Sequence, residues 1–202
     1  MNRWAYPWTV LHSGLVVLVG IAVCMQAGCM SAERAAEIET AAAERSPLTG
    51  KRAPDFALPN QAGETVTLQA QKGRWAVLYF YPADGTPGCT CQAQEFNKSH
   101  AQFQRLSAKV FGVSPDSVAS HKNVADKYNL KVDLLADPDQ HVMEAYGASA
   151  KTPFGRRVIR STVLIDPAGR IAYHWPEVIA QGHADRVRAK LDELKSGEPG
   201  SP

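Results

Sequence analysis

Four cysteines are the residues of this chain with the most direct use in chemistry. Cys89 and Cys91 lie together in the middle of the 202 residues, whereas Cys24 and Cys29 lie in an apolar N-terminal stretch. Four cysteines are too few for a disulfide-dense scaffold of this length. Because a thiolate is both a nucleophile and a ligand for soft metals, the central pair indicates redox or metal chemistry.

The residues before Cys89 predict a reactive thiol. An apolar run at 75–80 is typical of a strand buried on both faces, and a loop follows it. Ligands of open α/β sheets bind beyond the carboxyl ends of strands. Thr86 followed by Pro87 predicts the N-cap and the first residue of a helix, which puts Cys89 in the first turn. Free N–H groups and the positive end of the helix dipole favour a thiolate there.

The composition indicates a folded chain with one domain, or at most two small ones. Hydrophobic residues make up 45% of the chain and charged residues 21%, which excludes global disorder. The net charge is +2. A nucleic-acid binder should carry a basic patch or stripe, so this balance argues against a nucleic-acid partner.

Strand and helix patterns alternate along the chain and predict an α/β domain that holds the Cys89 loop. Apolar runs predict strands at 75–80, 110–113, 133–135, 158–165 and 171–174. A 3.6-residue spacing predicts helices within 89–109, 118–128, 140–146 and 183–194, and short runs at 56–58 and 65–68 predict a small hairpin. This order gives a central mixed β-sheet flanked by helices on both faces, as in a thioredoxin-like fold.

The loop and the chain after it resemble a known family. Pro82-x-x-x-Thr86-x-x-Cys89 resembles the peroxidatic motif of peroxiredoxins, and residues 78–90 look like their bacterioferritin comigratory protein (BCP/PrxQ) subfamily. The likeness covers nearly all of the predicted domain, which makes chance an implausible explanation. It continues at 112–114, 116–117, 125–128, 134–137, 145–147, 160–166 and 182–185.

The resemblance implies a thiol-dependent peroxidase that reduces hydrogen peroxide and organic hydroperoxides without haem, flavin or metal. Cys89 would be the peroxidatic cysteine, which attacks the O–O bond and becomes a sulfenic acid. Thr86 would hydrogen-bond the thiolate and the peroxide, and Pro82 would shield the pocket from water. Arg160 would stabilise the thiolate and the transition state. The chemistry needs an oxygen held in line with the sulfur and fixed donors for the leaving oxygen.

Cys91 departs from the pattern of the subfamily. Many members have a resolving cysteine five residues after the peroxidatic one, where this chain has Gln94. Residues two apart on a helix point to different sides, so a Cys89–Cys91 disulfide would need the first turn to unwind and would be strained. Three interpretations stay open. Cys91 is a resolving thiol, a bystander in a one-cysteine mechanism with an external thiol, or a thiol for another protein or a metal.

Two other functions use the same two cysteines. A membrane-tethered thiol–disulfide oxidoreductase is one alternative, but that chemistry needs Cys-x-x-Cys and this chain has Cys-x-Cys. A copper-binding thioredoxin-fold protein is the other, but such proteins space the pair as Cys-x-x-x-Cys and add a distant histidine. No two histidines of this chain have ligand spacing, so we expect no metal site.

The N-terminal stretch resembles a lipoprotein signal peptide. The apolar run at 14–25 suits the h-region of a signal peptide better than a membrane span, which needs about 20 residues. Small residues just before Cys29 resemble the lipobox of bacterial lipoproteins, in which the chain is cut before a cysteine that becomes lipidated. We therefore expect a signal peptide at 1–28 and a lipid on Cys29. An uncleaved anchor and a cleaved, soluble protein are the alternatives.

The rest of the chain is expected to consist of three parts. Residues 29–52, rich in Ala and Glu, would be a flexible tether before a thioredoxin-like domain at 53–195. Residues 196–202 would be a disordered tail. A lipid anchor would hold the domain at the bacterial cell envelope, facing the periplasm. We expect a monomer or weak dimer whose partners are a peroxide, the membrane and an external thiol reductant such as a thioredoxin-like protein.

Overall fold

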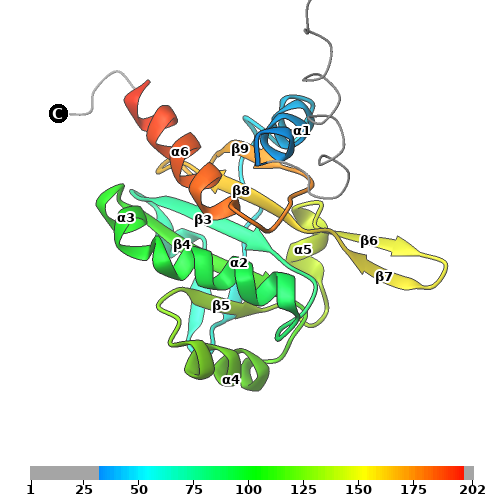
Figure 1. The fold of residues 1–202 in the computed structure, drawn as a ribbon. Coiled ribbons are helices and arrows are strands. Elements are labelled where there is room, and N and C mark those ends of the chain that lie inside the picture. The colour runs from blue at the N-terminus through cyan, green and yellow to red at the C-terminus, as the bar shows by residue number, and fades with distance from the viewer. Residues whose placement is uncertain (1–31, 198–202) are drawn as a thin grey trace, which may run out of the picture. The chain divides into compact units, whose positions relative to one another are not determined.

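A five-stranded mixed sheet organises residues 32–197, the part of the chain that the computed structural model describes (Figure 1). The strand order is β5-β4-β3-β8-β9. Strands β3, β4 and β5 run parallel, whereas β8 is antiparallel to β3 and β9 is antiparallel to β8. The prediction of a central mixed sheet is therefore confirmed. The strands span Trp75–Phe80 (β3), Ala108–Ser114 (β4), Asp133–Ala136 (β5), Ser161–Ile165 (β8) and Ile171–Trp175 (β9).

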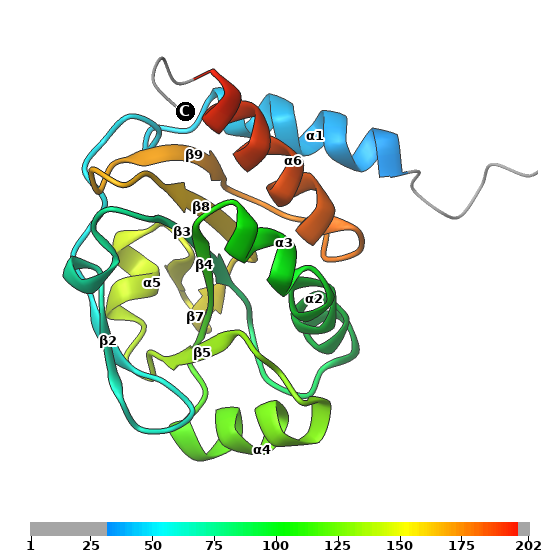
Figure 2. The same cartoon turned by 90° about the vertical axis from the view of Figure 1, so that its left-hand side faces the viewer.

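Helices cover both faces of this sheet, as predicted (Figure 2). Alternate residues of β3 point to opposite faces, with Tyr79 in one core cluster and Phe80 in the other. Phe96 and Val187 bring α2 and α6 to the Tyr79 face, and Met143 brings α5 to the Phe80 face. The helices are α1 (Ala32–Glu44), α2 (Pro87–Lys98), α3 (His100–Arg105), α4 (Val118–Tyr128), α5 (His141–Ala145) and α6 (His183–Ser196).

Tyr79 fixes the height of α2 above the sheet. Its ring is fully buried and stacks on the ring of Phe96 with centroids 4.6 Å apart. A Cβ atom at Gly112, on the neighbouring strand β4, would lie 2.6 Å from the Tyr79 ring. Only glycine therefore allows the ring to lie there, and the stack in turn supports the helix that begins with the Cys89 turn.

Two predicted elements differ from the structure. The helical stretch expected within 89–109 is two helices, α2 and α3, with a break at Ser99. The strand expected at 158–165 begins only at Ser161, because the residues before it form a separate hairpin of β6 (Ser149–Thr152) and β7 (Gly155–Val158). The predicted small hairpin is present as β1 (Ala57–Pro59) and β2 (Thr65–Thr67). A short 3₁₀ helix, η1 (Gln69–Gln71), follows β2.

Helix α1 corrects the expectation of a flexible tether at 29–52. Glu39 of this helix is only 2% exposed, and its carboxylate pairs with Arg186 of α6 at 2.8 Å. The backbone N–H of Gly50 donates a hydrogen bond to the carbonyl of Ile171 in β9. The segment docks through these polar contacts together with a few apolar side chains, Ala43 and Leu48, and its shortage of large apolar residues is why the sequence suggested a tether. Burial alone would raise the pKa of Glu39, but hydrogen bonds with His183 and Arg186 hold it below its usual value.

The predicted signal peptide at 1–28 and the lipid attachment at Cys29 lie outside the described residues. The predicted tail begins inside α6, which includes Ser196, and residues 198–202 are also outside the description. Among residues 32–197, no helix is long and apolar enough to cross a membrane.

Candidate active site at the start of helix α2

Cys89 lies in the first turn of α2, directly beyond the carboxyl end of β3, as predicted. Thr86 is the N-cap residue and Pro87 is the first helical residue. The Thr86 side chain makes no cap hydrogen bond, and its Oγ1 donates instead to the carbonyl of Ala83 at 3.3 Å. The Cys89 side chain is 4% exposed, so the helix start and the burial together hold the sulfur in a fixed place.

Arg160 brings a guanidinium group to this sulfur. The residue directly precedes β8, whose Ser161 pairs with Phe80 at the end of β3. Arg160 Nη2 donates a hydrogen bond to Cys89 Sγ at 3.1 Å, and Nη1 donates to the side-chain carbonyl of Gln92. A guanidinium at this distance stabilises negative charge on the sulfur and on an oxygen bound next to it.

Gln92 is a site residue that the sequence analysis missed. It lies one turn after Cys89, is fully buried and accepts the hydrogen bond that orients Arg160. Its Nε2 has no hydrogen-bond partner among the described residues. The available signal was a polar residue in the buried stripe of α2, which contains Cys89, Gln92, Ala93 and Phe96.

A buried polar network ties the loop before Cys89 to the rest of the domain. The Asp84 carboxylate accepts hydrogen bonds from Tyr81 Oη at 2.8 Å, from Ser120 Oγ at 2.7 Å and from His121 Nδ1 at 2.8 Å. The Asp84 backbone N–H donates to Asp116 at 2.8 Å. Burial alone would raise the pKa of Asp84, but the hydrogen bonds from His121 and Ser120 hold it below its usual value. Sequence patterns did not reveal this network, because residues 81–84 and 116–121 are brought together only by the tertiary fold.

The other predicted residues lie in the same loop but not against the sulfur. Pro82 and Thr86 are exposed, and no hydrogen bond among the described residues joins Thr86 to Cys89 Sγ. The geometry thus brings Cys89 and Arg160 together and leaves Pro82 and Thr86 at the rim. A cavity of about 10 Å³ lies beside Cys89, lined also by Tyr81, Asp84, Gly85, Thr90, Ala93, Val124 and Leu134. This is close to the space that one water molecule needs.

Cys91 lies on the outer side of α2 and is exposed. Its thiol donates a hydrogen bond to Glu95 Oε1 at 3.7 Å. Partial desolvation and the negative charge of Glu95 raise the pKa of the Cys91 thiol. Cys89 and Cys91 are both free thiols in this structure. Among residues 32–197, no group of three or more His, Cys, Asp or Glu side chains is arranged to hold a metal ion.

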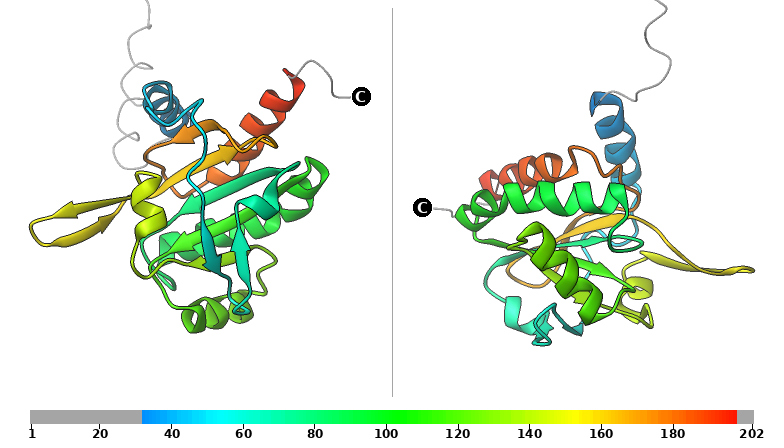
Figure 3. Two further views of the ribbon diagram at one scale, coloured as in Figure 1. Left: turned by 180° about the vertical axis from the view of Figure 1, so that it is seen from behind. Right: turned by 60° about the horizontal axis from the view of Figure 1, so that its bottom comes forward.

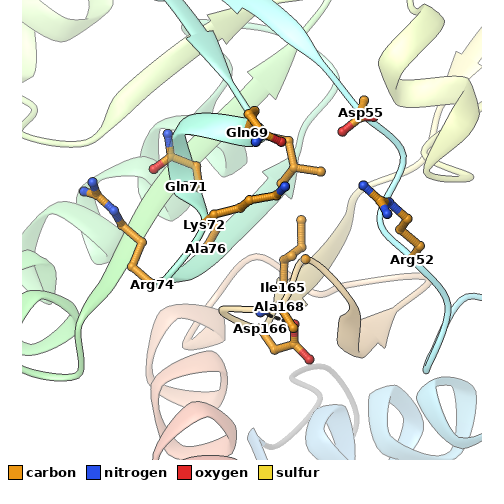
Figure 4. Close-up of a pocket in the computed structure, with 12 residues that line it drawn as sticks. Arg52, Asp55, Gln69, Gln71, Lys72, Arg74, Ala76, Ile165, Asp166 and Ala168 are labelled. Atoms are coloured by element: carbon orange, nitrogen blue, oxygen red, sulfur yellow. Dashed lines mark hydrogen bonds between the residues drawn. The ribbon is translucent and has the colours of Figure 1, made fainter.

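A second cavity lies at the opposite end of the sheet, where β3 begins and β8 ends (Figure 4). Arg52, Lys72 and Arg74 make its lining basic, and Asp55 and Asp166 are the acidic members. None of the predicted site residues lines it. The Cys89 thiol and the Arg160 guanidinium therefore lie at the carboxyl end of β3, away from this cavity.

Comparison with known proteins agrees with this geometry. The model of the AhpC/TSA family matches residues 49–174. A putative peroxiredoxin Bcp of Coxiella burnetii is 42% identical over 146 residues, which are 70% of this chain and 97% of the relative. Peroxiredoxin Bcp of Bacillus subtilis is 41% identical over 149 residues, which are 72% and 95%.

Solved structures of peroxiredoxins show the same fold. The structure of peroxiredoxin Q from Xanthomonas campestris superposes with a TM-score of 0.64 at 37% identity, covering 68% of this chain and 90% of its own. BcpB from Mycobacterium tuberculosis gives a TM-score of 0.67 at 30% identity, covering 72% and 97%. Together with the Cys89–Arg160 site, these matches show that the chain belongs to the AhpC/TSA family and, within it, to the Bcp/PrxQ peroxiredoxins, which are thiol-dependent peroxidases.

Proposed function

We propose that Cys89 reduces hydrogen peroxide and organic hydroperoxides through a sulfenic acid, and that an external thiol regenerates it. One observation carries this proposal: Arg160 Nη2 lies 3.1 Å from a Cys89 sulfur that is buried in the first turn of a helix. The cation and the helix start both stabilise negative charge at the place where the reaction creates it.

The first half of the cycle breaks the peroxide bond. The Cys89 thiolate attacks the terminal oxygen of ROOH, a sulfur–oxygen bond forms and the O–O bond breaks. The sulfur is oxidised to the sulfenic acid, and the alkoxide takes a proton and leaves as ROH, or as water when the substrate is hydrogen peroxide. Arg160 is positioned to bind the reacting oxygens while charge moves from sulfur to the leaving oxygen.

The second half of the cycle uses two equivalents of an external thiol. One thiol displaces water from the sulfenic acid and forms a mixed disulfide with Cys89. A second thiol, or the other thiol of a dithiol protein, attacks that disulfide and releases free Cys89 and an oxidised reductant. Cys91 is not used in this scheme, because it lies on the outer side of α2, where its thiol is hydrogen-bonded to Glu95.

Thr86 and Pro82 act at the rim of the site in this proposal. Thr86 Oγ1 donates to the carbonyl of Ala83 in the free protein, so it must turn to bind a peroxide oxygen. Pro82 would limit the access of water to the sulfur. The oxidoreductase and copper-binding alternatives have no comparable support, because the two thiols lie on different sides of the helix.

The proposed place of action is the bacterial cell envelope. The support is the resemblance of residues 1–29 to a lipoprotein signal peptide with its lipidated cysteine, Cys29. The domain would face the periplasm as a monomer or weak dimer and take electrons from a thioredoxin-like protein or a small thiol.

Mass spectrometry of the reduced protein after one equivalent of hydrogen peroxide tests the mechanism. We expect one added oxygen, mapped to the peptide with Cys89 and trapped by dimedone. Loss of two hydrogens within the peptide 87–98 would instead make Cys91 the resolving thiol. If neither product forms within seconds, the proposed chemistry at Cys89 is wrong.

A further inference from the structure

The β6–β7 hairpin projects from the domain (Figure 1). Phe154 lies in the turn between the two strands and is 101% exposed. Ile38 of α1, at 52%, is the other exposed large hydrophobic side chain among residues 32–197. A phenyl ring held fully in water at the tip of a projecting hairpin is better placed to bind a partner than to stabilise the fold.

Positive charges surround this tip. Lys151, Arg156 and Arg157 are exposed on the hairpin, and residues 149–160 contain no acidic residue. Among residues 32–197, Glu144 of α5 is the one carboxylate that forms ion pairs with the hairpin, with Arg156 at 2.8 Å and with Lys151 at 3.8 Å. An apolar tip surrounded by net positive charge complements an anionic lipid surface. The Phe154 ring can enter the headgroup region while the Lys and Arg side chains bind phosphates.

The hairpin, the active site and α1 meet at one end of the sheet. Strand β7 leads within two residues to Arg160, whose carbonyl accepts a hydrogen bond from the N–H of Val178 at 2.9 Å. The next residue, Ile179, donates its N–H to Glu39 of α1 at 2.8 Å. In both panels of Figure 3 the hairpin and α1 lie toward the same side of the domain.

The direction of α1 shows at which end of the domain this helix begins. After α1 the chain runs to Gly50, which bonds to Ile171 at the far end of β9, so the first turn of α1 points toward the active-site end. Cys29 lies three residues before Ala32, and an extended chain spans at most about 10 Å over three residues. In the proposed function, this short segment would join a lipid on Cys29 to the start of α1.

We propose that the β6–β7 hairpin binds an anionic phospholipid surface, with Phe154 inserted among the headgroups and Lys151 and Arg157 at the phosphates. This contact turns the Cys89 end of the domain toward the bilayer. Its setting in the cell rests on the proposed lipid anchor, whereas the contact itself belongs to the hairpin and can be measured without the anchor.

The fragment 32–202 allows this measurement, because it keeps every described contact. The family model matches residues 49–174, all inside this fragment, and 146 to 149 residues of this chain cover 97% and 95% of two relatives. An N-terminal histidine tag on nickel-chelating phosphatidylcholine vesicles takes the place of the lipid. The reporter is F154W, because Trp75 and Trp175, the other tryptophans of the fragment, are each 3% exposed and give a constant background.

We expect the emission of the F154W indole to shift to the blue and to be quenched by brominated lipid when the vesicles contain phosphatidylglycerol. The double substitution K151Q/R157Q should weaken vesicle binding of the untagged fragment about fivefold for each charge removed. K72Q/R74Q removes the same charge from the cavity at the opposite end and should change nothing.

Three outcomes would overturn the proposal. One is an F154W emission that is the same with and without phosphatidylglycerol. Another is an equal loss of binding in K72Q/R74Q. The third is self-association of the fragment that Phe154→Ser abolishes, because the tip would then bind a second copy rather than lipid. Peroxide consumption in solution is measured in parallel, and its absence would count against the proposed function and not against the membrane contact.

Discussion

The two sides of helix α2 each hold one cysteine, and the surroundings of the two thiols are opposite. Cys89 faces inward, is 4% exposed and has the Arg160 guanidinium at 3.1 Å. Cys91 faces outward and has the Glu95 carboxylate at 3.7 Å. Each residue turns an α-helix by about 100°, so an offset of two residues is enough to separate the sides completely.

This contrast indicates what would select Cys89 as the reactive thiol in the proposed function. Cys89 lies in the first turn of α2, where the free N–H groups and the dipole act, whereas Cys91 lies beyond that turn. Side chains that reach α2 from elsewhere or from its next turn add a second difference: a cation for Cys89 and an anion for Cys91. A cysteine at a helix start is therefore only half of the site, and the other half is the charge that the fold brings to it.

Removal of the inward thiol should have the largest effect. We expect Cys89→Ser to lower kcat/KM for hydrogen peroxide by at least about a thousandfold, because the hydroxyl is a far weaker nucleophile at neutral pH. The rate is measured by the oxidation of a thiol reductant in steady state. Residual turnover within tenfold of the native protein would mean that Cys91 can reduce peroxide alone. The inward position of Cys89 would then not explain the activity.

Removal of the cation beside Cys89 should have the next largest effect. We expect Arg160→Gln to lower kcat/KM about a hundredfold, in the range seen when one fixed donor to a developing charge is lost. Arg160→Lys should restore only part of the lost kcat/KM. An ammonium group lacks the planar pair of N–H donors that binds Gln92 and the Cys89 sulfur at the same time. Arg157→Gln is the matched control on the exposed hairpin and should leave the rate unchanged. Equal rates for the two glutamine variants would remove Arg160 from the mechanism.

Much of the fold could be predicted from sequence, because each core strand is a run of apolar residues. Strand β3 is buried at every position, and the predicted run at 75–80 matches it residue for residue. The hairpin β6–β7 was missed because its strands are mostly exposed and carry Lys and Arg. Its pairing comes from backbone hydrogen bonds and a turn, which leave no apolar alternation in the sequence.

Polar docking was the other feature that sequence patterns did not reveal. Helix α1 is held on the domain by Glu39, which reaches Arg186 and the N–H of Ile179, 147 and 140 residues away. The same holds at the active site, where Gln92 and Asp84 act through partners from distant segments. Motif spacing predicts the nucleophile, but the partners of a buried polar group are set by the tertiary fold.

Gln92 tests the surroundings of the inward thiol further, because its side chain accepts a hydrogen bond from Arg160. We expect Gln92→Met to lower kcat about tenfold, because the guanidinium loses the acceptor that aims it at Cys89. Thermal unfolding should change little, since the buried Nε2 that has no hydrogen-bond partner among residues 32–197 is removed with the amide. Gln94→Met, two residues on, is the matched control. An unchanged kcat in Gln92→Met would show that the hydrogen bond from Arg160 to Gln92 is not needed to position the guanidinium.

Glu95 tests the surroundings of the outward thiol, Cys91. Because partial desolvation and the Glu95 charge raise the pKa of Cys91 from a reference of 9.0, its thiolate is scarce at neutral pH. Alkylation of Cys91 by iodoacetamide should therefore be slow at pH 7 and rise until the pH exceeds about 9. Glu95→Gln removes the negative charge and should speed alkylation about twofold to threefold at pH 8, the scale of an exposed charge pair. A slower reaction in this variant would contradict the electrostatic assignment.

Removal of the outward thiol should have the smallest effect. With an external thiol in excess, Cys91→Ser should keep kcat/KM within about twofold, because the peroxide is reduced before any second thiol is needed. The sharper measurement is the rate at which oxidised Cys89 returns to the free thiol. If Cys91 resolves the sulfenic acid, C91S would slow this return and let Cys89 over-oxidise to the sulfinic acid at high peroxide. An unchanged return would place the whole catalytic cycle on the inward side of α2.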